Sequence, residues 1–340
     1  MPATQKQIAA SLGVSQALVA NVLNGKPGVW AAAETRRKIA ATARRLGYRP
    51  NRTARALVTG QTRTIAFWAA HLTTPFYASI LAAFSRQAAA AGYHLLTHVS
   101  GGEPGATLDD LAGTSACDGM VAVDVLHGGN HWAAALDHDA RPPLVLLGVH
   151  LPETTADTVF LDLAPGVRAG LNRLFASGCR RVAYLASRAM CRPDEVRYRE
   201  YHAALERHGG VPEVVPFDGG DLHGSRSALA SHLRANGRSD AVFCQNDDIA
   251  MGAYRALRDL DLRIPADVAL LGCDGIDQLA YFDPAISSIR TPVEKMCATA
   301  WAFLARRMAD RTLPRQSATL PARFIPRGST RFGKKYATER

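Results

Sequence analysis

Four carboxylates follow two apolar segments in the second half of this chain. Asp247 and Asp248 come after "DAVFCQN", and Asp274 and Asp277 come after "VALLGC". Such groups could act as acid and base in a glycoside hydrolase, bind a metal ion, or accept hydrogen bonds from a polar ligand. The chain carries no G-x-S-x-G, H-E-x-x-H or P-loop motif, and no histidine spacing completes a metal site. We therefore expect no catalytic residue, no metal and no cofactor, and we interpret Asp247 and Asp274 as hydrogen-bond partners of a ligand.

The six cysteines show no metal-binding or disulfide pattern. They include no C-x-x-C and no paired histidine spacing, which argues against a zinc site and a disulfide framework. Length and hydropathy predict a globular chain of two or three domains, because 340 residues with 47% apolar content can form several cores. No apolar run approaches the roughly 18 residues that a membrane span needs, and "MPATQKQIAA" lacks the apolar region of a signal peptide. The expectation is a cytoplasmic protein with no membrane partner.

The positive charge of the chain is concentrated at its two ends. Residues 1–65 contain eleven lysines and arginines and a single acid, and residues 323–340 contain six basic residues and one acid. In residues 66–322, acids outnumber bases by 28 to 23. A basic N-terminal module on a mildly acidic body is typical of a phosphate-binding head attached to a different kind of domain.

The first fifty residues carry the start and stop signals of three short helices. Thr4 is a helix cap before "QKQIAASL", Gly13 ends that helix, and Ser15 caps "QALVANVLN" after the tight turn "GVS". A third amphipathic helix is predicted from about residue 32 to residue 46, with Gly47 as its stop. Two short helices joined in this way are typical of a helix-turn-helix.

The exposed face of the second predicted helix carries almost no charge. The face available to a DNA major groove consists of Gln16, Ala17, Ala20, Asn21 and Asn24, of which the first four are expected to read bases. Asparagine and glutamine pair best with adenine, and alanine can contact a thymine methyl, so we expect half-sites read mainly at A·T pairs. The residues expected to contact phosphates are Ser15, Asn24, Lys26, Arg36, Arg52 and Arg55.

The segments "GVS", "VLNGKPGV", "TRRKIAATARRLGYRPN" and "TRTIAF" are correctly spaced over the first 65 residues and resemble the LacI/GalR family of bacterial transcription regulators. The resemblance implies a hinge helix over residues 51–61 that folds on the operator and inserts Leu57, with Ala54 one turn earlier, into the minor groove. Its segment "NRTARAL" is too short for a stable isolated helix, so the ordering of the hinge must come from DNA and from the dimer mate. The alternative is a plain basic linker.

From residue 64 onward, short apolar runs alternate with helical stretches, which predicts parallel sheets covered by helices. The expected fold is α/β, with an all-α helix-turn-helix head and, by resemblance, a two-lobed periplasmic-binding-protein-like core of parallel sheets. The segment "ATLPARFIP" is expected to be the last strand of that core. The expected boundaries are a head at 1–50, a hinge at 51–61, a core at 62–325 with lobe one at 62–161 and 292–322 and lobe two at 162–291, and a basic flexible tail at 326–340.

The resemblance also implies the effector-binding residues of the core. They are Phe76 in "TPFY", Arg197 in "VRYRE", Asn246 and Asp247 in "QNDD", and Asp274 in "GCDG". An arginine and an aspartate across a cleft, with an asparagine between them, can bind a polyol or a base. Structural roles remain open for each of them: core packing for Phe76, surface charge for Arg197, helix capping for Asn246 and Asp247, and a turn for Asp274.

Several positions depart from the family pattern. The first-lobe strand end that often reads D-R in the family reads Gly148-Val149-His150 here, and a usual asparagine is Leu163, which leaves the first-lobe ligand contacts undefined. The segment 187–199 is rich in arginine, which suits an acidic or phosphorylated ligand or an exposed surface.

These features favour a homodimeric repressor, or a dimer of dimers, that reads a pseudo-palindromic double-stranded operator and responds to a small effector, for which a sugar or sugar derivative is expected. The alternatives are a transport-type solute-binding protein, which the missing signal peptide and the basic head disfavour, and a ligand-responsive activator.

Overall fold

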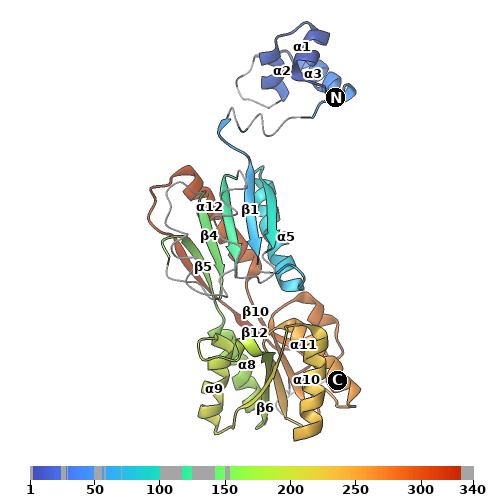
Figure 1. Ribbon diagram of the computed structural model, residues 1–340, viewed down its shortest axis with the longest axis vertical. Helices are drawn as coiled ribbons and strands as arrows, with labels where there is room; N and C mark the ends of the chain where they lie inside the picture. Colours follow the sequence, from blue (N-terminus) through green and yellow to red (C-terminus); the bar gives the residue numbers. More distant parts are fainter. Residues whose placement is uncertain are drawn as a thin grey trace. The chain divides into compact units, whose positions relative to one another are not determined.

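The computed structural model describes residues 3–23, 28, 30–49, 56, 59–69, 71–99, 117–124, 142–149 and 154–330. The chain divides into two compact units, Met1–Thr62 and Arg63–Arg340, which are described separately below (Figure 1). Among the residues that the structure describes, none of the helices has the length and apolar character that crossing a membrane would require.

Within its described residues, the first unit contains three short helices, α1 (Gln5–Leu12), α2 (Gln16–Leu23) and α3 (Ala33–Arg45). The Thr4 side chain accepts a hydrogen bond from the backbone N–H of Gln7, and the Gln7 side chain accepts one from the backbone of Thr4, which satisfies two free donors of α1. Gly13 ends α1 in the left-handed conformation, with φ 64. One side chain from each helix, Ile8, Val19 and Ile39, is fully buried in the small core. The helix-turn-helix head is confirmed.

The second unit contains two six-stranded sheets, one in each lobe (Figure 1). The first sheet has the order β11-β5-β4-β3-β1-β2 and is parallel throughout. Its strands are β1 (Thr64–Ala69), β2 (His94–Val99), β3 (Gly119–Val123), β4 (Leu144–Gly148), β5 (Asp157–Asp162) and β11 (Ser317–Pro321). The helices α5 (Pro75–Ala90) and α12 (Val293–Ala309) pack on it and on each other.

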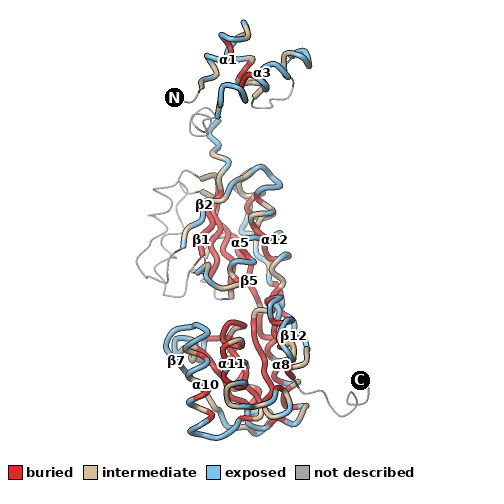
Figure 2. The backbone as a smooth tube through the Cα atoms, turned by 90° about the vertical axis from the view of Figure 1, so that its right-hand side faces the viewer, coloured by how far each residue is buried: buried red, intermediate tan, exposed pale blue. Residues whose placement is uncertain are grey.

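The second sheet has the order β12-β10-β9-β8-β6-β7 and is parallel except for the β10–β12 pair. Its strands are β6 (Val182–Ser187), β7 (Glu213–Phe217), β8 (Ala241–Cys244), β9 (Ala269–Asp274), β10 (Ser287–Arg290) and β12 (Arg323–Ile325). Its helices are α8 (Ala164–Ala176), α9 (Val196–His208), α10 (Leu222–Asn236) and α11 (Asp247–Asp259), with the 3-10 turns η2 (Arg188–Met190) and η3 (Asp277–Tyr281). Buried residues concentrate in the inner strands of each sheet, whereas the edge strands β2 and β12 have none (Figure 2).

The two sheets repeat one strand order, in which the first strand of each lobe lies between the second and the third. In open parallel sheets of this kind, ligands bind beyond the carboxyl ends of the strands. In the first lobe those ends lead into α5, Asp124 and Gly148, and in the second lobe they lead into α9, Asn246 and Asp274. The expected fold class, a two-lobed core of parallel sheets, is confirmed. In this fold the carboxyl ends of the strands lie at the facing edges of the two lobes.

Two expectations about the end of the core were wrong. The segment "ATLPARFIP" forms two strands rather than one, because the chain leaves the first sheet after Pro321 and enters the second at Arg323, with Ala322 buried between them. Residues 326–330 are not a flexible tail, since Ser329 and Thr330 are fully buried in the second lobe. The Ser329 hydroxyl donates to the carbonyl of Leu270 and accepts from the backbone N–H of Ser287. Residues 331–340 lie outside the described residues.

One ion pair connects three elements of the first lobe. The fully buried carboxylate of Asp157 at the start of β5 accepts two hydrogen bonds from Arg307 of α12, at 3.1 and 2.8 Å, and two from Gln316 beside β11, at 2.7 and 3.0 Å. The Arg307 guanidinium also donates to the carbonyls of Leu313 and Pro314. Breaking a buried pair by removing one partner is costly, because the other charge remains without compensation.

We predict that Arg307→Ala lowers the free energy of unfolding by about 3–5 kcal/mol, because Asp157 then stays buried without its cation. The adjacent and exposed Arg306→Ala is the matched control, and its effect should stay within about 0.5 kcal/mol. Urea unfolding followed by circular dichroism measures both. Equal effects of the two substitutions would show that the pair does not stabilise the first lobe.

Candidate ligand site and nucleic-acid interface

The predicted recognition face of the head lies on α2. Ser15 caps this helix, since its hydroxyl oxygen accepts a hydrogen bond from the backbone N–H of Leu18 at 3.2 Å. Gln16 and Ala17 are exposed, whereas Ala20 and Asn21 are half-buried. Leu18 packs against the core of the head, so the outer surface near the start of α2 is left to short, uncharged side chains. This surface fits direct contact with base edges more readily than contact with phosphates.

The basic side chains of the head lie mostly on α3. Arg36 is exposed, and its Nε donates to the carbonyl of Ala31 at 3.3 Å. Trp30, which the sequence analysis did not single out, precedes α3 and is 94% exposed. The remaining expected DNA contacts lie outside the described residues: Asn24, Lys26, Arg52, Ala54, Arg55 and Leu57.

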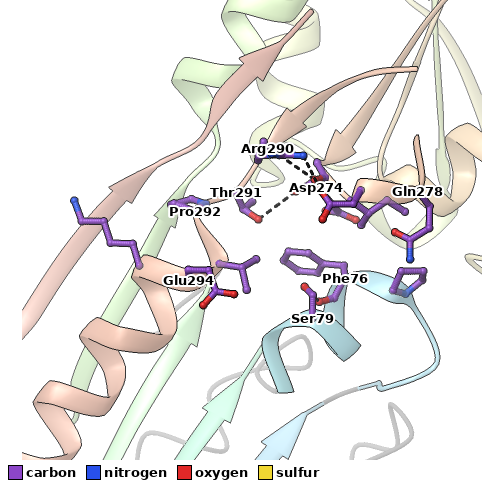
Figure 3. A pocket seen from close by; sticks show the side chains of 14 residues that line it. Phe76, Ser79, Asp274, Gln278, Arg290, Thr291, Pro292 and Glu294 are labelled. Carbon is purple, nitrogen blue, oxygen red and sulfur yellow. Dashed lines mark hydrogen bonds and ion pairs between the residues drawn. The ribbon is translucent and has the colours of Figure 1, made fainter. Parts of the chain in front are cut away.

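In the second unit, a pocket of about 520 Å³ lies between the two lobes. Phe76 and Ser79 of α5 form one wall, and the residues from Asp274 to Gln278 together with those from Arg290 to Lys295 form the other (Figure 3). Phe76 also belongs to the buried core of the first lobe and packs against the ring of Tyr77, 5.3 Å away. Of the predicted effector-binding residues, Phe76 and Asp274 therefore line this pocket.

Asp274 occupies the carboxyl end of β9 in an unusual conformation. Its φ is 140, which L residues rarely adopt, and such strain is typical of functional sites. Its carbonyl oxygen accepts hydrogen bonds from the backbone N–H and the hydroxyl of Thr291, at 3.1 and 3.2 Å (Figure 3). Burial raises the pKa of the Asp274 carboxyl well above its usual range, and the charge of Asp247 raises it further, whereas Arg197 lowers it.

Asn246 and Asp247 have structural contacts in this structure. Asn246 caps α11 by accepting a hydrogen bond from the backbone N–H of Ile249 at 2.8 Å. The fully buried Asp247 carboxylate accepts from the N–H groups of Gly275 and Ile276, at 2.7 and 2.8 Å, and from the Ser288 hydroxyl at 2.6 Å. Burial raises the pKa of Asp247 to about 6. Neither residue lines the pocket, and Asp247 instead fixes the turn that follows Asp274.

Arg197 lies in the first turn of α9 with a largely buried side chain. Its guanidinium donates to the fully buried carboxylate of Glu195, and its charge acts on Asp274 and on Tyr77. Arg197 Nε is buried without a hydrogen-bond partner within the described residues. Arg197 is therefore not a surface charge, and it lies near enough to Asp274 and Tyr77 to affect the pKa of both.

The sequence analysis missed Tyr77 and Asp124 on the first lobe. The Tyr77 hydroxyl donates to Asp124 at 3.2 Å. Burial raises the pKa of Tyr77 well above its usual value, and the charges of Asp124 and Asp274 add to this effect. Tyr77 stands next to Phe76 in the quoted motif, and Asp124 follows the apolar run "GMVAV", so both positions carried a sequence signal.

A helix-turn-helix head joined to a two-lobed core with a pocket between its lobes defines a ligand-responsive DNA-binding regulator. Comparison with known proteins supports this class. Residues 171–330 match the model of the periplasmic binding protein-like domain. The ribose operon repressor of Haemophilus influenzae is 28% identical over 91% of this chain and 92% of its own, and the CytR repressor of Escherichia coli is 28% identical over 97% and 96%.

A solved structure of a LacI-family transcriptional regulator from Sanguibacter keddieii is 30% identical to the chain. It superposes with a TM-score of 0.69 and covers 78% of this chain and 98% of its own. The chain belongs to the LacI family of transcriptional regulators.

The role of Asp247 gives a prediction. Asp247→Ala removes the acceptor of Ile276 and Ser288 and leaves Gly275 with only its 3.1 Å contact to the Ser288 hydroxyl, so we expect the free energy of unfolding to fall by about 3 kcal/mol. Asp247→Asn should retain most of the stability, because its oxygen can accept the two N–H groups while its amide donates to the Ser288 hydroxyl. Chemical denaturation measures both variants. Equal losses in the alanine and asparagine variants would show that the charge of Asp247, rather than its hydrogen bonds, stabilises this turn.

Proposed function

We propose that the protein is a dimeric transcriptional repressor whose affinity for its operator is controlled by a sugar or sugar derivative bound between the lobes of its core. The observation that carries the proposal is the presence, in one chain, of an uncharged recognition face on α2 and a pocket that meets both lobes at Phe76 and Asp274. The names of the relatives support repression and a sugar-related ligand.

The DNA side of the function follows from the head. One recognition helix reads one half-site, so a two-fold symmetric pair of chains reads a pseudo-palindrome. Gln16, Ala17, Ala20 and Asn21 contact base edges, while Ser15, Arg36 and the basic residues of the hinge contact phosphates. The paired Leu57 side chains enter the minor groove at the centre of the operator.

The ligand side follows from the core. Asp274 and Arg197 on the second lobe and Phe76 on the first lobe contact the effector, and Asp247 holds the Asp274 turn in place. A ligand that contacts both lobes stabilises one relative arrangement of them, and this arrangement biases the hinge helices toward order or disorder on DNA. The coupling is reciprocal, so operator DNA changes effector affinity by the same factor.

Selection of duplexes from a random library by the purified protein tests the function. The full-length protein should select a two-fold symmetric sequence whose half-sites are read at A·T pairs. A chain that lacks residues 1–62 should select no specific sequence. Specific binding that survives this deletion would contradict a DNA-reading head. A reporter gene placed downstream of the selected sequence distinguishes a repressor from an activator. Deleting the protein raises reporter expression if the protein is a repressor and lowers it if the protein is an activator.

We predict that Leu57→Ala weakens binding to the selected operator by at least about tenfold, while binding to unrelated DNA changes little, because minor-groove insertion depends on the site whereas phosphate contacts do not. Gel shifts at fixed salt concentration measure both affinities, and Val58→Ala is the neighbouring control. Equal losses on operator and unrelated DNA would exclude the minor-groove role.

A further inference from the structure

Trp30 is the most exposed large apolar side chain in the described part of the chain. It lies three residues before α3, and 94% of its surface is open to solvent. The core of the head is built around Ile8, Val19 and Ile39, and among the described residues Trp30 is not part of that core. Folding of the head therefore leaves the large apolar face of this indole available to a partner.

Two arginines of α3 lie beside Trp30. The Arg36 Nε donates to the carbonyl of Ala31, the residue next to Trp30, at 3.3 Å. The Arg37 Nε donates to the carbonyl of Ala33 at 3.5 Å. Both arginine side chains are exposed, and both run back toward the start of the helix. These contacts place two guanidinium groups and one indole at the same end of α3.

The charge at the start of α3 is positive. Glu34 is the only acid among residues 1–65, which carry eleven lysines and arginines. It lies in the first turn of α3 and pairs with Lys38 at 2.8 Å. The hydrogen bond from Lys38 and its positive charge lower the pKa of Glu34, so this pair persists at neutral pH. The excess of cations around Trp30 favours a polyanion as the partner of this surface.

We propose that Trp30 is a DNA contact of the head, in which its indole packs against a deoxyribose of the operator backbone, next to the phosphates that Arg36 and Arg37 bind. One helix fills the width of the major groove, so α2 meets the bases and the start of α3 meets the backbone at the edge of the groove. An indole supplies a large apolar contact at a low cost in side-chain entropy. The inference rests on the proposed function, because it adds a contact to the same DNA interface.

A contact with the sugar differs in two measurable ways from the other predicted contacts of the protein. Every nucleotide carries the same sugar, so Trp30 contributes equally on any sequence, whereas Leu57 is predicted to act on the operator alone. An uncharged side chain releases no counterion from DNA, so Trp30 leaves the salt dependence of binding unchanged, whereas Arg36 contributes to it.

Binding of the full-length protein to labelled duplexes at several salt concentrations tests these two differences. Trp30→Ala should weaken binding to the selected operator and to unrelated DNA by the same factor, about tenfold, with the wild-type slope of log affinity against log salt. Arg36→Ala is the comparison, and its slope should become shallower by about 0.9. Trp30→Phe keeps an aromatic ring and should lose less affinity than Trp30→Ala.

Three results of this experiment would overturn the proposal: wild-type affinity in Trp30→Ala, a loss confined to the operator, or a shallower salt slope in Trp30→Ala. Val211→Ala is the matched control, because Val211 is 82% exposed but lies in the second lobe, between α9 and β7. This control should bind both DNAs as the wild type does. Circular dichroism should show the wild-type Tm for Trp30→Ala, since an exposed side chain contributes little to stability.

Tryptophan fluorescence tests the contact itself. The Trp30 signal is the difference between the wild type and Trp30→Phe, and Trp68 stays fully buried in both. Acrylamide should quench this signal in the free protein, and bound operator should shield it. Quenching that operator does not change contradicts the contact. Shielding in the absence of DNA contradicts it as well, because the indole would then pack on another part of the protein or on a second copy.

The same measurements distinguish this proposal from the proposed function. A wild-type protein that selects no operator contradicts the proposed function. An operator that is selected and then bound equally well by the wild type and by Trp30→Ala contradicts only the contact made by Trp30.

Discussion

Asp247 lies buried in the first turn of α11, where its carboxylate accepts hydrogen bonds from the backbone of Gly275 and Ile276 and from the Ser288 hydroxyl. This contact ties α11 to the end of β9 and to β10, the strand from which the chain returns to the first lobe. Asp274, with its strained backbone, is held between these anchors. The ligand site and the crossing between the lobes therefore depend on one carboxylate that does not line the pocket, because a strained turn persists only where its surroundings fix it.

Charge is distributed differently in the head and the core. In the head, basic residues are in excess, and the predicted recognition face of α2 carries no charge. Phosphate contacts and base contacts are therefore expected from different side chains. In the described part of the core, Arg197 pairs with Glu195 and Arg290 pairs with Asp277. Each pair weakens the attraction of its cation for distant anions.

The fold was predictable from local signals, whereas parts of the site were not. Thr4, Gly13 and Ser15 define the helix ends of the head, and the apolar runs of the body locate the strands, because capping and periodicity act over a few residues. The expected single strand over "ATLPARFIP" was wrong at Ala322, since the change of sheet there is set by tertiary packing. The capping contact of Asn246 was one of the alternatives that the sequence left open. Asp124 was missed because its position depends on Tyr77 and on Gly148, which are distant in sequence and adjacent only after the sheet forms.

The position of the last strands determines which parts of the chain can fold first during synthesis. The head uses contacts within residues 3–49 and can fold as soon as it emerges. Both lobes, in contrast, need the C-terminal segment: β11 completes the first sheet, β12 completes the second, and Ser329 binds Leu270 and Ser287. Because domains fold as units during synthesis, a nascent chain holds a finished DNA-reading module well before either half of its sensor is complete.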